Sequence, residues 1–146
     1  MLIRTTMLCL LAVALAGCTS SETPLPEGAP PLYNVSGQVT YHNSPVAEAI
    51  VVFAPKNGKV GASARTDAEG RFTAQAFPPH KGMPEGDFAV TVTKTESVDV
   101  SGGDPDNKQT KTKYIIPQKF GNASKSGLSV KVTSAGNDNL VLELKD

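Results

Sequence analysis

Tryptophan, cysteine and long apolar runs are absent or scarce in this chain of 146 residues. Tryptophan is missing, and the only cysteines are Cys9 and Cys18. The longest apolar run, residues 7–16, has 10 residues, whereas a membrane-spanning helix needs roughly 20. Lys plus Arg total 14, as do Asp plus Glu. Because no excess of positive charge is available to neutralise phosphates, nucleic-acid binding is not expected.

The N-terminal residues follow the pattern of a secretory signal peptide, with one charge at Arg4, a short apolar run and then small residues. The sequence Leu15-Ala16-Gly17-Cys18 resembles the lipobox of bacterial lipoproteins. The resemblance implies a signal peptide over residues 1–17, cleavage between Gly17 and Cys18, and lipid on Cys18. The alternative is an ordinary secreted protein that is cleaved after another small residue.

A lipid anchor on Cys18 would also determine where the chain resides. Each buried methylene of an acyl chain contributes about 0.8 kcal/mol, and several chains on one cysteine hold a protein on a membrane without a spanning helix. By the sorting rule of the resembled lipoproteins, Thr19 in place of Asp favours the outer membrane of the bacterial cell envelope. Cleavage removes Cys9 and acylation blocks Cys18, so thiol catalysis, disulfides and cysteine-ligated metals are not expected.

Residues 18–32 are rich in Pro, Ser, Thr and Glu, and we interpret them as a tether between the lipid and a folded domain over residues 33–146. Proline favours extended backbone, so residues 19–32 could reach roughly 40 Å at about 3.1 Å per residue. A proline-rich ligand for a partner protein is the alternative interpretation.

From residue 33 onward the hydrophobic pattern has the period of two that is typical of strands, and no segment shows a sustained helical period. Turn residues separate the strands, including Asn57-Gly58, which favours a tight hairpin turn, and Asp67 to Gly70, where glycine accepts a positive φ. We therefore expect an all-β, seven-stranded antiparallel β-sandwich. The expected strands are residues 35–41, 49–54, 61–66, 71–75, 87–95, 128–133 and 140–144.

Several of these segments resemble carboxypeptidase regulatory-like domains. The matching stretches are VSGQVTY at 35–41, TDAEGRF at 66–72, GMPEGDFAVTV at 82–92 and, as in a lipoprotein branch, IPQKF at 116–120. The resemblance implies a transthyretin-like (prealbumin-like) sandwich and speaks to fold more than to activity. The chain has Asn43-Ser44 where the family often has glycine, and we expect the turn to persist because Asn tolerates left-handed backbone.

The residues that could carry chemistry do not form a catalytic pattern. His42 and His80 fall in predicted turns, are expected to be exposed, and are too isolated for a metal site. The His and Arg set of the transthyretin-like hydrolases is missing, and so is a G-x-S-x-G elbow. Asp67 and Glu69 suit turn chemistry better than acid–base catalysis. We therefore predict no catalytic residues, no metal and no cofactor.

Residues 96–113 form the longest polar stretch of the predicted domain and are expected to be a solvated loop. Asp99, Asp104 and Asp106 in this loop could offer carboxylates to calcium, but the closing Glu of a calcium loop is missing. A contact between the loop and a partner is the other possibility, since loops of this length are uncommon unless they are functional or disordered.

These observations favour a lipid-anchored, non-enzymatic module of the envelope that serves a binding or structural role, with an envelope protein as its possible partner. The alternative is a small-ligand or carbohydrate-binding lipoprotein that uses loops at one end of the sandwich. A hydrolase is the third class. Carbohydrate stacking would need exposed aromatic rings, and the tyrosines available are Tyr33, Tyr41 and Tyr114, so the count favours protein contact or scaffolding.

Overall fold

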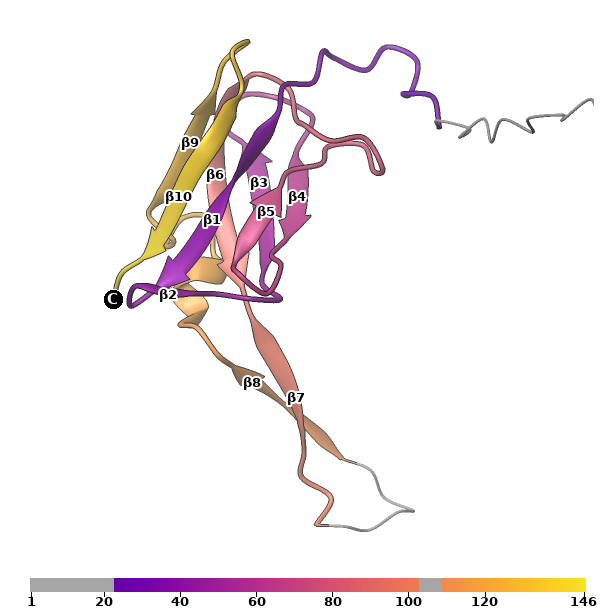
Figure 1. The fold of residues 1–146 in the computed structure, drawn as a ribbon. Helices are drawn as coiled ribbons and strands as arrows, with labels where there is room; N and C mark the ends of the chain where they lie inside the picture. The colour runs from indigo at the N-terminus through magenta and orange to yellow at the C-terminus, as the bar shows by residue number, and fades with distance from the viewer. Residues whose placement is uncertain (1–22, 103–108) are drawn as a thin grey trace, which may run out of the picture.

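Two four-stranded sheets and a separate two-stranded ribbon make up the fold (Figure 1). The computed structural model describes residues 23–102 and 109–146. The elements are β1 (Val35–Tyr41), β2 (Ser44–Pro45), β3 (Ile50–Pro55), β4 (Ala62–Arg65), β5 (Arg71–Thr73), β6 (Gly86–Thr93), β7 (Thr95–Asp99), β8 (Thr110–Tyr114), the 3₁₀ helix η1 (Gln118–Gly121), β9 (Leu128–Val132) and β10 (Asn137–Leu144).

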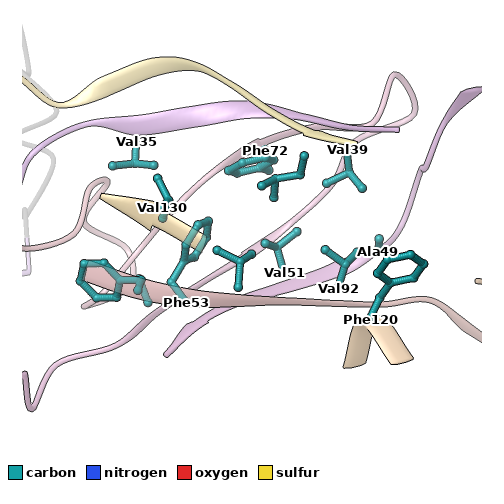
Figure 2. Packing of buried hydrophobic residues seen from close by; sticks show 14 of the residues in the cluster. Val35, Val39, Ala49, Val51, Phe53, Phe72, Val92, Phe120 and Val130 are labelled. Carbon is teal, nitrogen blue, oxygen red and sulfur yellow. The ribbon is translucent and has the colours of Figure 1, made fainter. Parts of the chain in front are cut away.

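In the first sheet β10 pairs with one edge of β1, and β2 and β5 both pair with the other edge. The second sheet has the order β4-β3-β6-β9. The two sheets face each other across one hydrophobic core, and Figure 2 shows Val35, Val39 and Phe72 of the first sheet opposite Val51, Phe53 and Val92 of the second. The all-β sandwich is therefore confirmed. All seven expected segments contain a strand, and the described residues hold three more, β2, β7 and β8.

The alternation in the sequence matches the buried faces of the strands. Val35 and Val39 of β1 are fully buried, as are Val51 and Phe53 of β3. The apolar run at 49–54 lies centrally in its sheet, as expected, because β3 has β4 on one side and β6 on the other. Burying side chains of this size stabilises the fold by about 1.5–3 kcal/mol each.

One strand pair differs from the expected antiparallel arrangement. β1 and β10 run parallel, with Gly37 opposite Leu140 and Tyr41 opposite Leu144, and the register shifts between Val35 and Gly37. An alternating pattern shows which face of a strand is buried, but not the direction of its neighbour. The antiparallel expectation is wrong at this pair for that reason.

The turns match the expectations only in part. His42 and Asn43 take φ values of 48° and 63° between the paired residues Tyr41 and Ser44, so the first hairpin persists without glycine. Gly70 has a φ of 73°, as expected. The prediction of a tight turn at Asn57-Gly58 is wrong. The register of β3 with β4 ends at Phe53–Ala62, and a longer loop joins the two strands.

The prediction of an irregular loop at 96–113 is wrong for the residues of this range that the structure describes. β7 and β8 pair in register from Thr95–Tyr114 to Asp99–Thr110 and form a ribbon, which we call the arm. All ten residues of these two strands are exposed. A strand that is exposed on both faces carries no apolar alternation, and so the sequence pattern did not reveal it.

The tether and the arm leave the sandwich at opposite ends (Figure 1). Residues 23–32 lead to Tyr33, whose backbone exchanges two hydrogen bonds with Met83, and the chain then enters the upper end of β1. The tether is not uniformly extended, because Gly28 has a φ of 79° and the Ala29 N–H donates to the Pro26 carbonyl. Within the described residues, no helix is long and apolar enough to cross a membrane.

Candidate functional site at the base of the arm

The expected cleavage site between Gly17 and Cys18, and the expected lipid attachment at Cys18, lie outside the described residues. Cleavage and lipid attachment therefore stay predictions.

His42 lies in a surface cluster with Tyr41 and Asp146. One carboxylate oxygen of Asp146 lies 2.9 Å from His42 Nε2 and accepts the Tyr41 hydroxyl at 3.0 Å. Desolvation, followed by the hydrogen bond and charge of Asp146, raises the pKa of Tyr41, so that its hydroxyl stays a donor. The His42 side chain is 66% exposed, as expected, and in the part of the chain described no serine or threonine hydroxyl bonds to its ring. The cluster fastens the end of the chain to the first hairpin.

His80 is half-buried, so the expectation that it is exposed is wrong. Its Nε2 atom is enclosed and has no hydrogen-bond partner in the described structure. A metal ion needs several ligands at one place. Nowhere in residues 23–102 and 109–146 do three or more His, Cys, Asp or Glu side chains come together.

The carboxylates singled out from the sequence stabilise turns. Asp67 accepts the backbone N–H of Glu69 at 3.0 Å and that of Arg71 at 2.7 Å, which confirms its turn role. Asp99 accepts the hydroxyl of Ser101 and its N–H, the latter at 2.8 Å, and these bonds lower the pKa of Asp99. The other two residues of the calcium hypothesis, Asp104 and Asp106, lie outside the described residues.

A groove of about 530 Å³ runs over the outer face of the first sheet, along β1 and between β5 and β10. Its polar groups are largely occupied. Arg65 pairs with Glu48, Gln38 Nε2 donates to the Glu69 carbonyl at 2.7 Å, and the Ser36 hydroxyl donates to the Asp138 carbonyl at 3.1 Å. The only aromatic side chain in its lining, Phe72, is 4% exposed and belongs to the core. Arg71, Thr73 and Asn139 complete the polar lining, and the described lining has no exposed aromatic ring for stacking.

A smaller pocket of about 250 Å³ lies where the arm joins the sandwich. Its floor is formed by the apolar residues Val92 and Ile116, which belong to the core and are 0% and 3% exposed. Its polar lining residues are Thr93, Lys94, Gln118 and Asn122, and Tyr114 of β8, Pro117 and Gly121 complete the lining. An apolar floor with a few polar groups around it is the usual make-up of a small-molecule site.

Three local features fix the positions of the elements around this pocket. The Ile115 N–H donates to the Lys94 carbonyl at 3.0 Å and closes the base of the arm. Phe120, which is 2% exposed, anchors η1 in the core. A Cβ atom on Gly121 would lie 3.0 Å from Thr93 Oγ1, so glycine leaves η1 and the end of β6 close together without crowding.

The register of the arm sorts its side chains onto two faces. One face, which we call the hydroxyl face, carries the cross-strand pairs Thr95–Tyr114, Ser97–Thr112 and Asp99–Thr110. The other face carries Glu96 opposite Lys113 and Val98 opposite Lys111. Tyr114 therefore belongs both to the pocket and to the hydroxyl face. An irregular loop at 96–113 gave no reason to expect this site. The one available signal for a strand is the alternation of Thr and Lys in TKTKY at 110–114, which is polar on both faces and therefore lacks apolar alternation.

Comparisons with known proteins do not assign a family. No protein-family model matches the chain, and no curated protein matches it. A Pseudomonas aeruginosa protein described as a "putative carbohydrate binding protein" has a similar structure, with 14% identity, a TM-score of 0.41, and coverage of 77% of this chain and 88% of that one. A 9R-lipoxygenase from Cyanothece has 18% identity and a TM-score of 0.38 over 84% of this chain. This chain spans only 18% of the lipoxygenase. Likenesses this weak support no functional argument, and the all-β class rests on the two sheets themselves.

Proposed function

We propose that the chain is a lipid-anchored, non-enzymatic binding module of the bacterial cell envelope that contacts its partner through the arm. The observation that carries this proposal is the position and exposure of the arm. It projects from the end of the sandwich opposite the tether (Figure 1), and every residue of β7 and β8 is exposed. With lipid on Cys18, the arm would extend away from the membrane surface.

The energetics of the arm support a binding role. An isolated two-stranded ribbon is at best marginally stable in water, and ordering each of its residues costs about 1–2 kcal/mol of backbone entropy. The exposed fractions of Val98, Val100 and Tyr114 are 41%, 51% and 47%, and no core element covers these side chains. A partner that covers these side chains and pairs with a free strand edge would offset the cost of ordering the arm.

The contacts of the polar side chains support a non-enzymatic role. Asp67 and Asp99 hydrogen bond to neighbouring backbone groups, and Asp146 joins Tyr41 and His42 at the surface. Steady turnover of generic ester or peptide substrates by the purified protein would contradict this part of the proposal.

The anchor is tested by Cys18→Ser. We expect this variant to appear in the soluble fraction after cell lysis, whereas the wild-type protein remains with membranes. Unchanged membrane retention would contradict the lipid anchor.

The arm is tested by replacing residues 95–114 with Asn-Gly. Lys94 and Ile115 are already hydrogen bonded, so a two-residue turn can join them. We expect an unchanged melting temperature, because no core side chain is removed, and loss of the partner from crosslinking in intact cells. Val141→Ser is the control, since Val141 lies on β10 and is 65% exposed. An identical crosslinking pattern without the arm would rule out this contact.

A further inference from the structure

We propose that the pocket at the base of the arm, together with the hydroxyl face, binds a neutral glycan chain. One sugar ring would lie against Tyr114 in the pocket, and the following units would extend over Thr112 and Ser97. This inference goes beyond the proposed function, since it gives the arm a second ligand, on its hydroxyl face, besides the partner that pairs with a strand edge.

Tyr114 is the aromatic residue that is available for stacking. Its side chain is 47% exposed, whereas Tyr33 and Tyr41 are half-buried against the core and the Tyr41 hydroxyl is bonded to Asp146. A tyrosine offers an apolar ring and a polar hydroxyl, which match the C–H face and the hydroxyl groups of a sugar. The exposed ring that carbohydrate binding would need is therefore present, although the small number of tyrosines in the sequence argued against it.

The pocket has the size and chemistry for one ring. Its volume of about 250 Å³ lies just below the range of drug-sized sites, about 300–1,000 Å³. Gln118 carries both donor and acceptor atoms, Asn122 offers its Nδ2 donor while its Oδ1 accepts the Ser124 N–H at 2.9 Å, and Lys94 adds a donor. Together these groups can donate hydrogen bonds to, and accept them from, the hydroxyl groups of a sugar that lies above the apolar floor of Val92 and Ile116.

The hydroxyl face continues this chemistry along the arm. The pairs Thr95–Tyr114, Ser97–Thr112 and Asp99–Thr110 lie in register. Their Cβ atoms are about 5 Å apart across the strands, and successive pairs follow at about 7 Å along them. Five of these six side chains carry hydroxyl groups, each a donor and an acceptor, so a row of hydrogen-bonding groups follows the stacking ring along the arm.

The charge of the arm favours a neutral polymer. Its described strands carry Glu96 and Asp99 against Lys111 and Lys113, so they attract neither a polyanion nor a polycation over a distance. The groove on the first sheet is the weaker candidate for a glycan, because no exposed aromatic ring lines it.

The experiment is a calorimetric and NMR titration of the full processed protein in detergent micelles. The probes are cellotetraose and chitotetraose, which are extended, and maltotetraose, which is curved. We expect binding of at least one extended tetrasaccharide, with shifted signals from Tyr114, Thr112 and Asn122. Tyr114→Ala should weaken binding about tenfold, and Tyr114→Phe should stay within about threefold of wild type because it keeps the ring.

Two further variants separate this site from general effects. Thr112→Val removes a hydroxyl from the hydroxyl face and should weaken binding about threefold, whereas Val98→Thr on the opposite face should leave binding unchanged. Equal binding by wild type and Tyr114→Ala, or no binding of any tetrasaccharide at millimolar concentration, would overturn the inference.

The inference and the proposed function can fail separately. If no tetrasaccharide binds but the Asn-Gly replacement still abolishes crosslinking to an envelope protein, the glycan inference is wrong and the proposed function stands. If the replacement changes nothing in cells, the proposed function is wrong as well.

Discussion

Gly37 of β1 lies directly against the backbone of β10. A Cβ atom at this position would lie 1.9 Å from the Leu140 carbonyl oxygen, which is backbone and cannot rotate away. We predict that Gly37→Ala lowers the free energy of unfolding by about 3 kcal/mol, since the two strands must separate to admit the methyl group. Urea denaturation followed by circular dichroism measures the change.

Gly58→Ala is the matched control for this substitution. Its Cβ atom would lie 3.4 Å from that of Pro55, an ordinary contact, and the effect should stay within about 0.5 kcal/mol. Equal effects at the two glycines would show that the close approach at Gly37 has no energetic importance.

Thr66 joins two segments through its hydroxyl. The side chain is 2% exposed, and its Oγ1 donates to the Val46 carbonyl at 2.6 Å and accepts from the Ala49 N–H at 2.8 Å. Thr66→Val leaves both backbone groups buried without a partner, at about 1–3 kcal/mol each. We predict a loss of about 3 kcal/mol in thermal or urea unfolding, against about 1 kcal/mol for Thr66→Ser, which keeps the hydroxyl. Similar losses in both variants would contradict this role.

Single residues could be predicted from the sequence where their partners are close in the chain. Asp67 bonds to the N–H groups of residues 69 and 71, and Gly70 takes its positive φ within the same turn. Thr66 could not be recognised in this way, because its partners lie 17 and 20 residues earlier. The same limit applies to Tyr114, whose pocket is formed by residues from β6, η1 and the arm.

The arm should respond to acid at its outer end. The two hydrogen bonds from Ser101 lower the pKa of Asp99 from its ordinary 3.8, so the folded arm binds this proton less readily than the unfolded chain. Their contribution to stability is therefore fully present above the ordinary pKa and is lost as the pH falls through the lowered value.

NMR titration of the Asp99 carboxyl and the Ser101 amide measures this effect. We predict that Ser101→Ala returns the pKa of Asp99 towards its ordinary value, while the amide signals of β6 stay unchanged as an internal control. A titration curve that is the same in both proteins would show that Ser101 does not act on Asp99.

Strands could be predicted where one face contacts the core. β6 alternates Phe88, Val90 and Val92 with half-buried residues, and its pattern was clear in the sequence. β7 and β8 have no buried face, and β2 has only two residues. Such elements exist because of hydrogen bonding to a neighbour, which hydrophobic periodicity does not report.

At the scale of the molecule, the opposite positions of tether and arm predict a dependence on tether length. Residues 23–28 are exposed, and pairing with the sandwich begins at Tyr33. Deleting residues 23–29 should leave the melting temperature and the ligand affinity of the purified protein unchanged. Crosslinking to a partner in cells should decrease, because the arm reaches less far from the membrane.

A control for this deletion replaces residues 23–29 with a Gly-Ser sequence of equal length, which should restore crosslinking. Full crosslinking by the shortened protein would show that the distance from the membrane does not limit the contact.

The class of the whole molecule could be predicted, but one feature of its topology could not. The positions of the turns and the alternating residues were enough for an all-β sandwich with one core. The parallel pairing of β1 with β10 depends on which strands meet across about 100 residues of chain, and local patterns contain no information on that choice.

This pairing has a consequence for biogenesis. A chain that is exported from its N-terminus presents β1 to the new compartment first and β10 last. The first sheet therefore lacks its edge strand β10 until residues 137–144 have emerged, and closing so long a loop is a slow step in folding. If the chain is exported as we propose, this order of emergence delays completion of the first sheet until the passage is nearly complete.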